Sequence, residues 1–255
     1  MRTPIYTGRT KFAEEIVAEF WMPQKPSAKA FIILDGCPAV PSKHTLGEFL
    51  ARKGYWVFHP RYRGSWESGG EFLQFSPDED VQLVALGLSG GFTNIWDGMT
   101  YYLDIKEINV IGASFGGAAA LLASRYPEIN KVIAVSPVTD HKAQDTTKGA
   151  ESNAEFLRQI RDGFGGAYRT NNKNYKKLLS GKFFNPIRHA KEIDGAQVFI
   201  IHAKDDDVIP LRLTKVFAKE IGVRPVILDK GGHLSSRIIT TTLIWKKIHL
   251  FLKSS

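Results

Sequence analysis

The chain has 255 residues, 43% of them hydrophobic, which is enough to build one large α/β domain with a sizeable core. Its single cysteine excludes an internal disulfide, and nothing in the sequence suggests a structural zinc site. No apolar segment approaches the length of a transmembrane helix, and residues 1–15 lack the apolar stretch of a signal peptide. We therefore expect a cytoplasmic protein with no membrane partner.

The net charge of +8 is spread unevenly along the chain. Residues 141–192 contain eleven Lys and Arg side chains but only five Asp and Glu. This excess has two interpretations, a solvated helical surface or the attraction of an anionic substrate. The segment lacks the interleaved aromatic side chains of a nucleic-acid stacking groove, so we expect no nucleic-acid partner.

Apolar runs predict strands that alternate with helices along the chain. The predicted strands are 11–22 (a half-exposed strand), 30–34, 55–59, 108–111, 131–137, 197–202 and 225–228. The predicted helices are 46–52, 80–88, 95–103, 118–123, 211–221 and 239–252. Such alternation favours a mostly parallel sheet covered on both faces. Residues 140–194 show no strand pattern and predict a small helical insertion, with helices at 155–161 and 174–179, inside a single domain of residues 1–255.

The stretch 109–117 has the pattern of a nucleophile elbow. Apolar residues 108–111 predict a buried strand, and residues 118–123 predict the helix that follows. Ser114 stands between them with small neighbours on both sides, as a strained strand-to-helix turn requires. A serine in any glycine-rich loop can match this pattern by chance, but the flanking strand and helix favour the elbow. The N–H of Phe115, at the start of the helix, is a candidate oxyanion donor.

A second oxyanion donor is expected from the turn that follows the predicted strand 30–34. This turn, residues 35–38, has the sequence Asp-Gly-Cys-Pro. Because the carboxyl ends of parallel strands lie at one edge of a sheet, the N–H groups of the turn should face the same crevice as Ser114. The N–H of Cys37 is the candidate.

A serine hydroxyl needs a base that takes its proton and an acid that orients the base. His233 is the only histidine directly after a late predicted strand, although a solvated loop histidine is the alternative interpretation. His202 ends a strand but precedes an acidic loop, so we interpret it as a structural hydrogen-bonding residue. Five histidines have no comparable position, and we expect most of them to lie on the surface: His44, His59, His141, His189 and His249.

The acid has several candidates. Three adjacent carboxylates, Asp205, Asp206 and Asp207, follow the predicted strand 197–202, and Asp140 follows an earlier strand. The acidic run could also be a solvated turn or a cation site. It lacks the spaced oxygen ligands of a calcium loop, however, so we expect no metal.

Together these segments resemble the α/β-hydrolase superfamily and, more closely, its prolyl-oligopeptidase-like branch, from about residue 30 to His233. The family's Gly-x-Ser-Tyr/Phe-Gly-Gly elbow is matched by residues 112–117, and its final Gly-His by the dipeptide that ends at His233. Its acidic loop aligns Asp206 with the catalytic acid. The resemblance implies an α/β-hydrolase fold, with a mostly parallel sheet flanked by helices and a small helical insertion after the sixth strand. It also implies catalytic roles for Ser114, Asp206 and His233.

Two positions depart from the family's pattern. The family often has His-Gly-Gly-Pro where this chain has residues 35–38, so the carboxylate of Asp35 would oppose an oxyanion if it pointed inward. The family's Arg-Gly-Ser loop, matched by residues 63–65, usually carries a tyrosine whose hydroxyl holds the oxyanion, and the aligned residue here is Ser68. The loss of one donor lowers the rate by about 10²–10³, so we expect modest activity or an easily cleaved substrate.

The resemblance implies a serine hydrolase that forms an acyl-enzyme without a cofactor. No segment before residue 30 is long enough for the propeller that filters substrates in the family's large peptidases, so we expect small carboxylic esters, or amides, as substrates. One alternative is a peptidase or aminopeptidase of the same family that acts on short peptides. Another is a hydrolase-fold binding protein without turnover, for which Asp35 and Ser68 are the best support. The insertion at 140–194 is expected to overhang the crevice and shape its substrate pocket.

Overall fold

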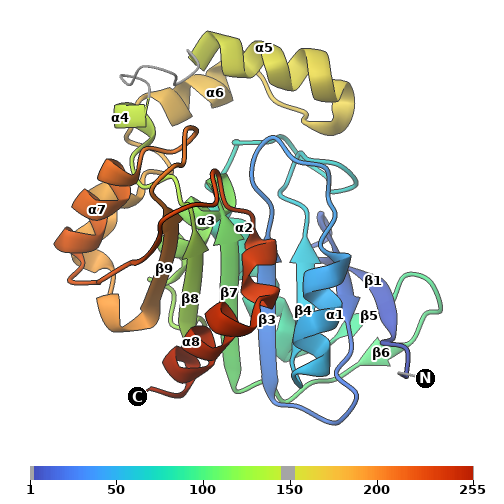
Figure 1. The fold of residues 1–255 in the computed structure, drawn as a ribbon. Helices are drawn as coiled ribbons and strands as arrows, with labels where there is room; N and C mark the ends of the chain where they lie inside the picture. The colour runs from blue at the N-terminus through green and yellow to red at the C-terminus, as the bar shows by residue number, and fades with distance from the viewer. Residues whose placement is uncertain (1–2, 145–152, 255) are drawn as a thin grey trace.

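The computed structural model describes residues 3–144 and 153–254, and its centre is one eight-stranded sheet. The strands of this sheet are β1 (Thr7–Phe12), β2 (Ile16–Trp21), β3 (Lys29–Leu34), β4 (Trp56–Pro60), β7 (Glu107–Ala113), β8 (Lys131–Val135), β9 (Val198–Ala203) and β10 (Val226–Leu228). Their order across the sheet is β1-β2-β4-β3-β7-β8-β9-β10 (Figure 1). Strand β2 runs antiparallel to β1 and β4, and all other neighbours are parallel. This confirms the predicted fold class, a mostly parallel sheet flanked by helices.

Helices cover both faces of the sheet because its central strands are apolar on both sides. They are α1 (His44–Arg52) and α8 (Thr242–Lys253) on one face, and α2 (Pro77–Gly90), α3 (Phe115–Ala123) and α7 (Leu211–Glu220) on the other. Successive side chains of a strand point to opposite faces. Thus Ile33 of β3 packs in the cluster that includes α1 and α8, while Ile32 packs in the cluster that includes α2 and α3.

Helical elements fill the chain between β8 and β9 within the described residues. They are α4 (His141–Gln144), α5 (Asn153–Phe164), the 3₁₀ turn η1 (Gly165–Ala167), α6 (Asn172–Leu179) and the 3₁₀ helices η2 (Pro186–Glu192) and η3 (Gly195–Gln197). Helices α5 and α6 lie above the ends of the strands in Figure 1. The N–H groups of Trp66 and Phe72 bond to the carbonyl groups of Ala167 and Arg169, at 2.7 Å each, and tie this segment to the loop after β4. The two helices predicted within 140–194 are therefore present, and residues 145–152 of that prediction lie outside the described residues.

Two of the predicted elements were wrong. The predicted strand 11–22 is a hairpin of β1 and β2, in which β2 is almost wholly buried because core clusters pack against both of its faces. The predicted helix 95–103 is instead the turn and second strand of a short hairpin, formed by β5 (Phe92–Thr93) and β6 (Thr100–Tyr101). Its apolar residues Ile95, Trp96 and Met99 are exposed, so their spacing does not mark a buried helical face.

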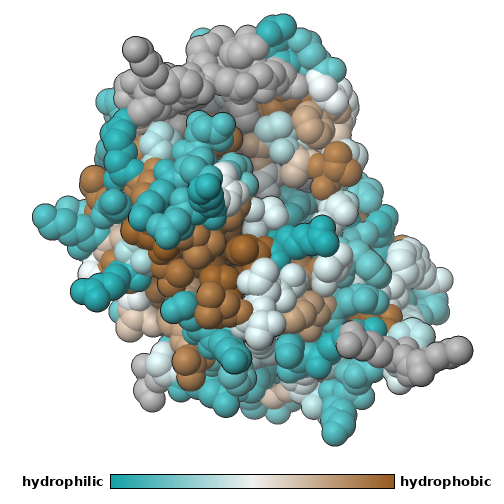
Figure 2. Space-filling view, in the orientation of Figure 1, coloured by the Kyte–Doolittle hydropathy of each residue, from teal (hydrophilic) through white to brown (hydrophobic). Residues whose placement is uncertain are grey.

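The core becomes thinner toward the β10 edge of the sheet. Figure 2 shows apolar side chains gathered over the region of β9, between α7 and α8 as Figure 1 places them. Half-buried Phe199, Val226 and Leu228 pack there against the cluster that contains α8. Among residues 3–144 and 153–254, no helix combines the length and the apolar character needed to cross a bilayer.

Candidate active site

Ser114 lies at the junction of β7 and α3 with a left-handed backbone, φ 56° and ψ −120°. Its N–H donates to the carbonyl of Val135 at 2.9 Å, and its carbonyl accepts from the N–H of Val138 at 3.1 Å. A non-glycine residue in this region of backbone space is strained by about 1–3 kcal/mol, and it persists only where neighbouring contacts enforce it. The end of β8 supplies those contacts.

Two glycines allow the chain to turn this sharply around Ser114. A Cβ atom on Gly112 would lie 1.9 Å from the carbonyl oxygen of Gly116. A Cβ atom on Gly116 would in turn lie 2.4 Å from the carbonyl oxygen of Asp35, which directly follows the neighbouring strand β3. No real side chain can occupy either space, so the small residues predicted for the elbow are a packing requirement.

The structure brings His233 and Asp206 into contact. The Nδ1 atom of His233 lies 3.0 Å from Oδ2 and 3.2 Å from Oδ1 of Asp206. Because the carboxylate accepts, Nδ1 carries the hydrogen and Nε2 keeps its lone pair. The Asp206 side chain is fully buried, whereas the His233 side chain is 26% exposed. The ring therefore has one anchored nitrogen and one nitrogen available to a substrate.

Asp206 is held by more than His233. Its Oδ1 atom accepts from the N–H groups of Val208 and Ile209, at 3.0 and 2.8 Å, and His202 Nε2 lies 3.1 Å from Oδ2. Burial alone would raise the pKa of Asp206, but the hydrogen bonds from His202, His233 and Ile209 outweigh it and hold the pKa well below its ordinary value. His202 also bonds to Thr214, which confirms its predicted structural role.

The loop that carries His233 is fixed by two further contacts. Asp205 accepts from the N–H groups of Gly231 and Gly232, at 3.2 and 2.9 Å. The N–H of Leu234 donates to Ser136 Oγ at 3.3 Å, and Ser136 directly follows β8. Neither contact was predicted from the sequence, since each joins segments that are distant in the chain.

The end of β8 thus holds both the elbow and the histidine loop. Val135 bonds to Ser114, and the next residue, Ser136, bonds to the neighbour of His233. Within the described part of the chain, no hydrogen bond joins the Ser114 hydroxyl to the His233 ring. Asp140, the other candidate acid, instead accepts from the N–H groups of its own helix α4 and from Asn185.

The turn after β3 lies directly against Ser114. A Cβ atom on Gly36 would lie 3.5 Å from the Cβ atom and 4.0 Å from the Oγ atom of Ser114. The backbone N–H groups of Cys37 and Phe115 donate to no acceptor within residues 3–144 and 153–254. The two candidate oxyanion donors are therefore free to bond to a ligand.

The carboxylate of Asp35 forms an ion pair with Lys43 and a hydrogen bond with His59, and it does not stand alone beside these donors. Its Oδ2 atom lies 2.8 Å from His59 Nε2, and its Oδ1 atom lies 2.8 Å from Lys43 Nζ. Burial tends to raise the pKa of Asp35, but His59 and Lys43 outweigh it and lower the pKa to about 2. The group is ionised, and its charge is compensated.

Ser68 cannot replace the family's tyrosine hydroxyl. It is buried, its Oγ atom donates to the carbonyl of Arg61 at 2.8 Å, and the same oxygen accepts from the N–H of Val17 at 2.9 Å. The bond to Val17 holds the loop after β4 against β2, and the bond to Arg61 lies within that loop. The hydroxyl therefore has a structural role and no hydrogen left for an oxyanion.

His59 is the residue of this region that the sequence interpretation missed. It was grouped with histidines expected mostly on the surface, yet it is fully buried. One signal was available, because His59 ends the predicted strand 55–59 just as Asp35 follows the predicted strand 30–34. Within the described residues, no group of three His, Cys, Asp or Glu side chains is arranged to hold a metal ion.

Comparisons with known proteins identify the family and similar folds. The sequence matches the model of the prolyl oligopeptidase family over residues 43–234. No curated protein sequence matches it.

Among solved structures it is similar to an esterase from Pyrococcus furiosus, with a TM-score of 0.69, 19% identity, and coverage of 98% of this chain and 91% of the other. It is also similar to an acylaminoacyl peptidase from Pyrococcus horikoshii, with a TM-score of 0.64, 19% identity, and coverage of 98% and 40%. A third is the α/β hydrolase GrgF from a Penicillium species, with a TM-score of 0.71, 15% identity, and coverage of 98% of both chains.

The ionised state of Asp35 leads to a prediction about stability. Its pKa is about 2 in the folded protein against an ordinary value of 3.8. A carboxylate whose pKa is lowered by folding stabilises the fold above its ordinary pKa, and this contribution is lost as the pH falls toward the folded value. It is about 2 kcal/mol at pH 7 and roughly half of that at pH 3. Urea midpoints of the wild type and Asp35→Asn should therefore differ clearly at pH 7 and converge toward pH 3. A gap that stays constant or widens in acid would contradict this account.

Proposed function

Because the chain belongs to the prolyl oligopeptidase family, we propose that it cleaves small carboxylic esters through an acyl-enzyme on Ser114. The family and the fold support a hydrolase of the α/β class. The observation that carries the proposal is the contact of 3.0 Å between His233 Nδ1 and Asp206 Oδ2, in a loop bonded to the strand end that also holds Ser114.

In this mechanism His233 is the general base. Asp206 fixes its Nδ1–H tautomer, so Nε2 takes the proton of the Ser114 hydroxyl as the oxygen attacks the substrate carbonyl. The imidazolium then gives this proton to the leaving alcohol. A water molecule reverses the steps and releases the acid.

The N–H groups of Phe115 and Cys37 would hold the developing oxyanion. Neither N–H group donates to an acceptor within the described residues. Cys37 follows Gly36, which packs against Ser114. Two backbone donors without a tyrosine hydroxyl stabilise an oxyanion less than three donors do. This favours an ester, whose alkoxide leaves more readily than the amine of a peptide.

The similar solved structures also favour an ester over a peptide as the substrate. The Pyrococcus furiosus esterase aligns over nearly its whole length, whereas the acylaminoacyl peptidase aligns over 40% of its own chain. Cleavage of aminoacyl amides is the second candidate, because the family model includes peptidases. Parallel assays with p-nitrophenyl esters and aminoacyl p-nitroanilides distinguish the two.

Removal of the nucleophile gives the first test. Ser114→Ala should lower kcat on p-nitrophenyl butyrate by roughly 10⁶, because without the hydroxyl no acyl-enzyme forms. A fluorophosphonate should label the wild type at Ser114, as shown by peptide mass spectrometry. Near-normal hydrolysis by the variant would remove the proposal, and an unlabelled, inactive wild type would support a binding protein instead.

The two candidates for the catalytic acid, Asp206 and Asp140, can be compared by mutation. Asp206→Asn should lower kcat by roughly 10³–10⁴, because an amide does not fix the His233 tautomer that a carboxylate fixes. Asp140→Asn is the matched control, since Asp140 bonds only to its own helix and Asn185 in the described structure. It should stay within about threefold of the wild type. The reverse order of effects would transfer the acid's role to Asp140.

The basic surface around the insertion gives a test of substrate charge. Exposed Lys and Arg side chains of α5 and α6 lie on the segment above the strand ends, and they include Arg161 and Lys173. They should attract anionic substrates. The kcat/KM ratio of p-nitrophenyl hemisuccinate to p-nitrophenyl butyrate should exceed one at 20 mM salt and fall at 500 mM, where screening is strong. A ratio that does not depend on salt would indicate that these side chains form only a solvated surface.

A further inference from the structure

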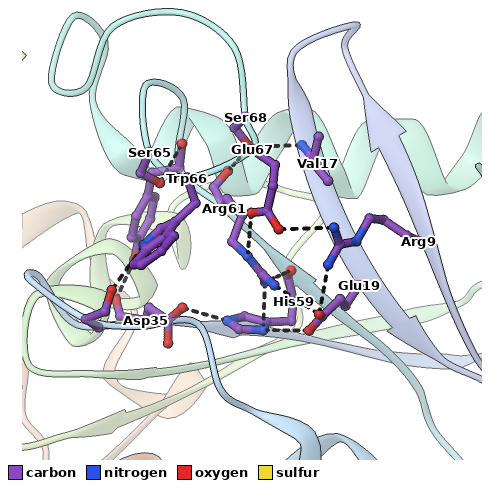
Figure 3. Close-up of polar contacts among 12 residues, drawn as sticks. Arg9, Val17, Glu19, Asp35, His59, Arg61, Ser65, Trp66, Glu67 and Ser68 are labelled. Carbon is purple, nitrogen blue, oxygen red and sulfur yellow. Dashed lines mark hydrogen bonds and ion pairs between the residues drawn. The ribbon is translucent and has the colours of Figure 1, made fainter. Parts of the chain in front are cut away.

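A charged cluster lies beneath the turn 35–38, with Asp35, His59 and Arg61 buried at its centre. We call it the Asp35 cluster, and Figure 3 shows most of it. Its members come from β2, β4 and the turns that follow β3 and β4: Glu19, Asp35, Lys43, His59, Arg61 and Glu67. No step of the proposed reaction uses these side chains, and buried charges are retained only where they are paired.

The central contact of the cluster is the hydrogen bond between His59 and Asp35. Arg61 donates from Nη1 to His59 Nδ1 at 2.9 Å, and an arginine can only donate. The lone pair of His59 is therefore on Nδ1, and its hydrogen is on Nε2. The Nε2–H donates to Asp35 Oδ2 at 2.8 Å. Nδ1 also lies 3.6 Å from Glu19 Oε2, which is beyond hydrogen-bond distance, so the arginine sets the direction of the His59 bonds.

Further ion pairs fix Arg61 in place. Glu19 Oε1 lies 3.2 Å from Arg61 Nη2, and Glu67 Oε2 lies 3.4 Å from Arg61 Nε. Arg9 bridges the same two carboxylates from β1, at 3.2 and 3.1 Å. The row from Asp35 to Arg9 therefore crosses the antiparallel part of the sheet and anchors the turn to three strands (Figure 3).

The turn held by this row is the turn that packs against the nucleophile. The carbonyl of Asp35 fills the space beside Gly116, and Gly36 lies against Ser114. The far end of the turn is fixed separately, because Ala39 bonds to the hydroxyl of Tyr168 and to Trp66 Nε1, at 3.0 and 3.1 Å. The near end is held by this row and by the Tyr62 hydroxyl, which donates to the carbonyl of Asp35 at 3.0 Å. The N–H of Cys37 lies between the two ends of the turn, so its direction depends in part on where Asp35 is held.

We propose that His59 is a positioning residue for the oxyanion hole, which acts by holding Asp35 so that the Cys37 N–H faces the carbonyl oxygen of the substrate. This inference rests on the proposed function and assigns a role to a histidine that touches no substrate. His59 and Lys43 also draw the carboxylate of Asp35 to the far side of the turn, where its charge is paired rather than opposed to the oxyanion.

Three variants separate the hydrogen bond from the charge. Asp35→Asn loses the charge but keeps an oxygen that can accept from His59, and Lys43 can turn to solvent. Asp35→Ala removes the acceptor, and His59→Phe removes the donor while a ring still fills the space. We expect the kcat of Asp35→Asn to stay within about threefold of the wild type on p-nitrophenyl butyrate. The kcat of the other two should fall about 10- to 100-fold with KM nearly unchanged, because a displaced donor acts on the transition state.

A second readout reports on the oxyanion hole itself. Replacing the C=O of the substrate by C=S puts a larger and weaker acceptor in the hole. The wild type and Asp35→Asn should therefore prefer the ester strongly over the matched thionoester. Asp35→Ala and His59→Phe should lose most of this preference. A loss of packing alone would lower both rates together and leave their ratio unchanged.

Asp78→Ala is the matched control. Asp78 is also a buried carboxylate, paired with Arg125 at 3.1 Å and with the Tyr126 hydroxyl at 2.8 Å. These partners lie just beyond the C-terminal end of α3, whereas Ser114 precedes its N-terminal end. The control should lower the urea midpoint but leave kcat per labelled site and the ester to thionoester ratio at wild-type values.

The outcomes distinguish this inference from the function on which it rests. If the wild type is labelled at Ser114 and Ser114→Ala is inactive, but Asp35→Ala and His59→Phe keep wild-type kcat and ester preference, the role of His59 is wrong and the hydrolase stands. If Asp35→Asn is as impaired as Asp35→Ala, the charge rather than the hydrogen bond is required, and the positioning proposal fails. If Ser114 is neither labelled nor needed, the proposed function fails first.

Discussion

The left-handed backbone of Ser114 is the constraint on which the site depends. A φ of 56° is unfavourable for serine, so close contacts on all sides must enforce it. Gly112 and Gly116 carry no side chain and so leave room for these contacts. The carbonyl of Asp35 packs into the space beside Gly116. Val135 supplies the hydrogen bond on the other side. The packing that strains the serine therefore also fixes its distance to the turn after β3 and to the end of β8.

These two neighbours carry the rest of the candidate machinery. The turn after β3 presents the N–H of Cys37, and the end of β8 continues into Ser136, which bonds to the loop of His233. Residues separated by more than a hundred positions in the chain are thus set relative to one another by three adjacent parallel strands. Loops at the carboxyl edge of such a sheet can vary in sequence while these backbone contacts persist.

The sequence was informative where one physical effect dominates. Strands β3, β7 and β8 are apolar on both faces, so their patterns predicted them well. The stretch 95–103 was mistaken for a helix because its exposed apolar side chains imitate a buried face. The hairpin of β1 and β2 was read as one half-exposed strand, because alternation within a segment does not reveal which strands will lie beside it.

In the candidate site, too, some residues could be predicted from the sequence and others could not. Ser114 could be predicted from local chemistry, since a turn with small neighbours leaves few alternatives. The choice of Asp206 needed a family resemblance, because adjacent carboxylates differ only in which one reaches the histidine. His59 could not be assigned without its partners. Its role is defined by Asp35 from another strand and by Arg61, and a sequence pattern gives no direction to such a bond.

Two of the Asp–His contacts in the described part of the chain, His59 with Asp35 and His233 with Asp206, join neighbouring strand ends, and their surroundings give them different chemistry. His233 bonds to Asp206 through Nδ1, is partly exposed, and has no partner for Nε2 within the described residues. His59 is fully buried, and both of its nitrogens are used, one as donor to Asp35 and one as acceptor from Arg61. Only the first ring can take a proton from a hydroxyl, because a base needs a free lone pair within reach of its substrate. The second ring has no such lone pair, and what its bonds can do is hold the turn in place. The same pair of residue types is thus suited to proton transfer in one position and to rigid support in the other, according to which nitrogen is left open.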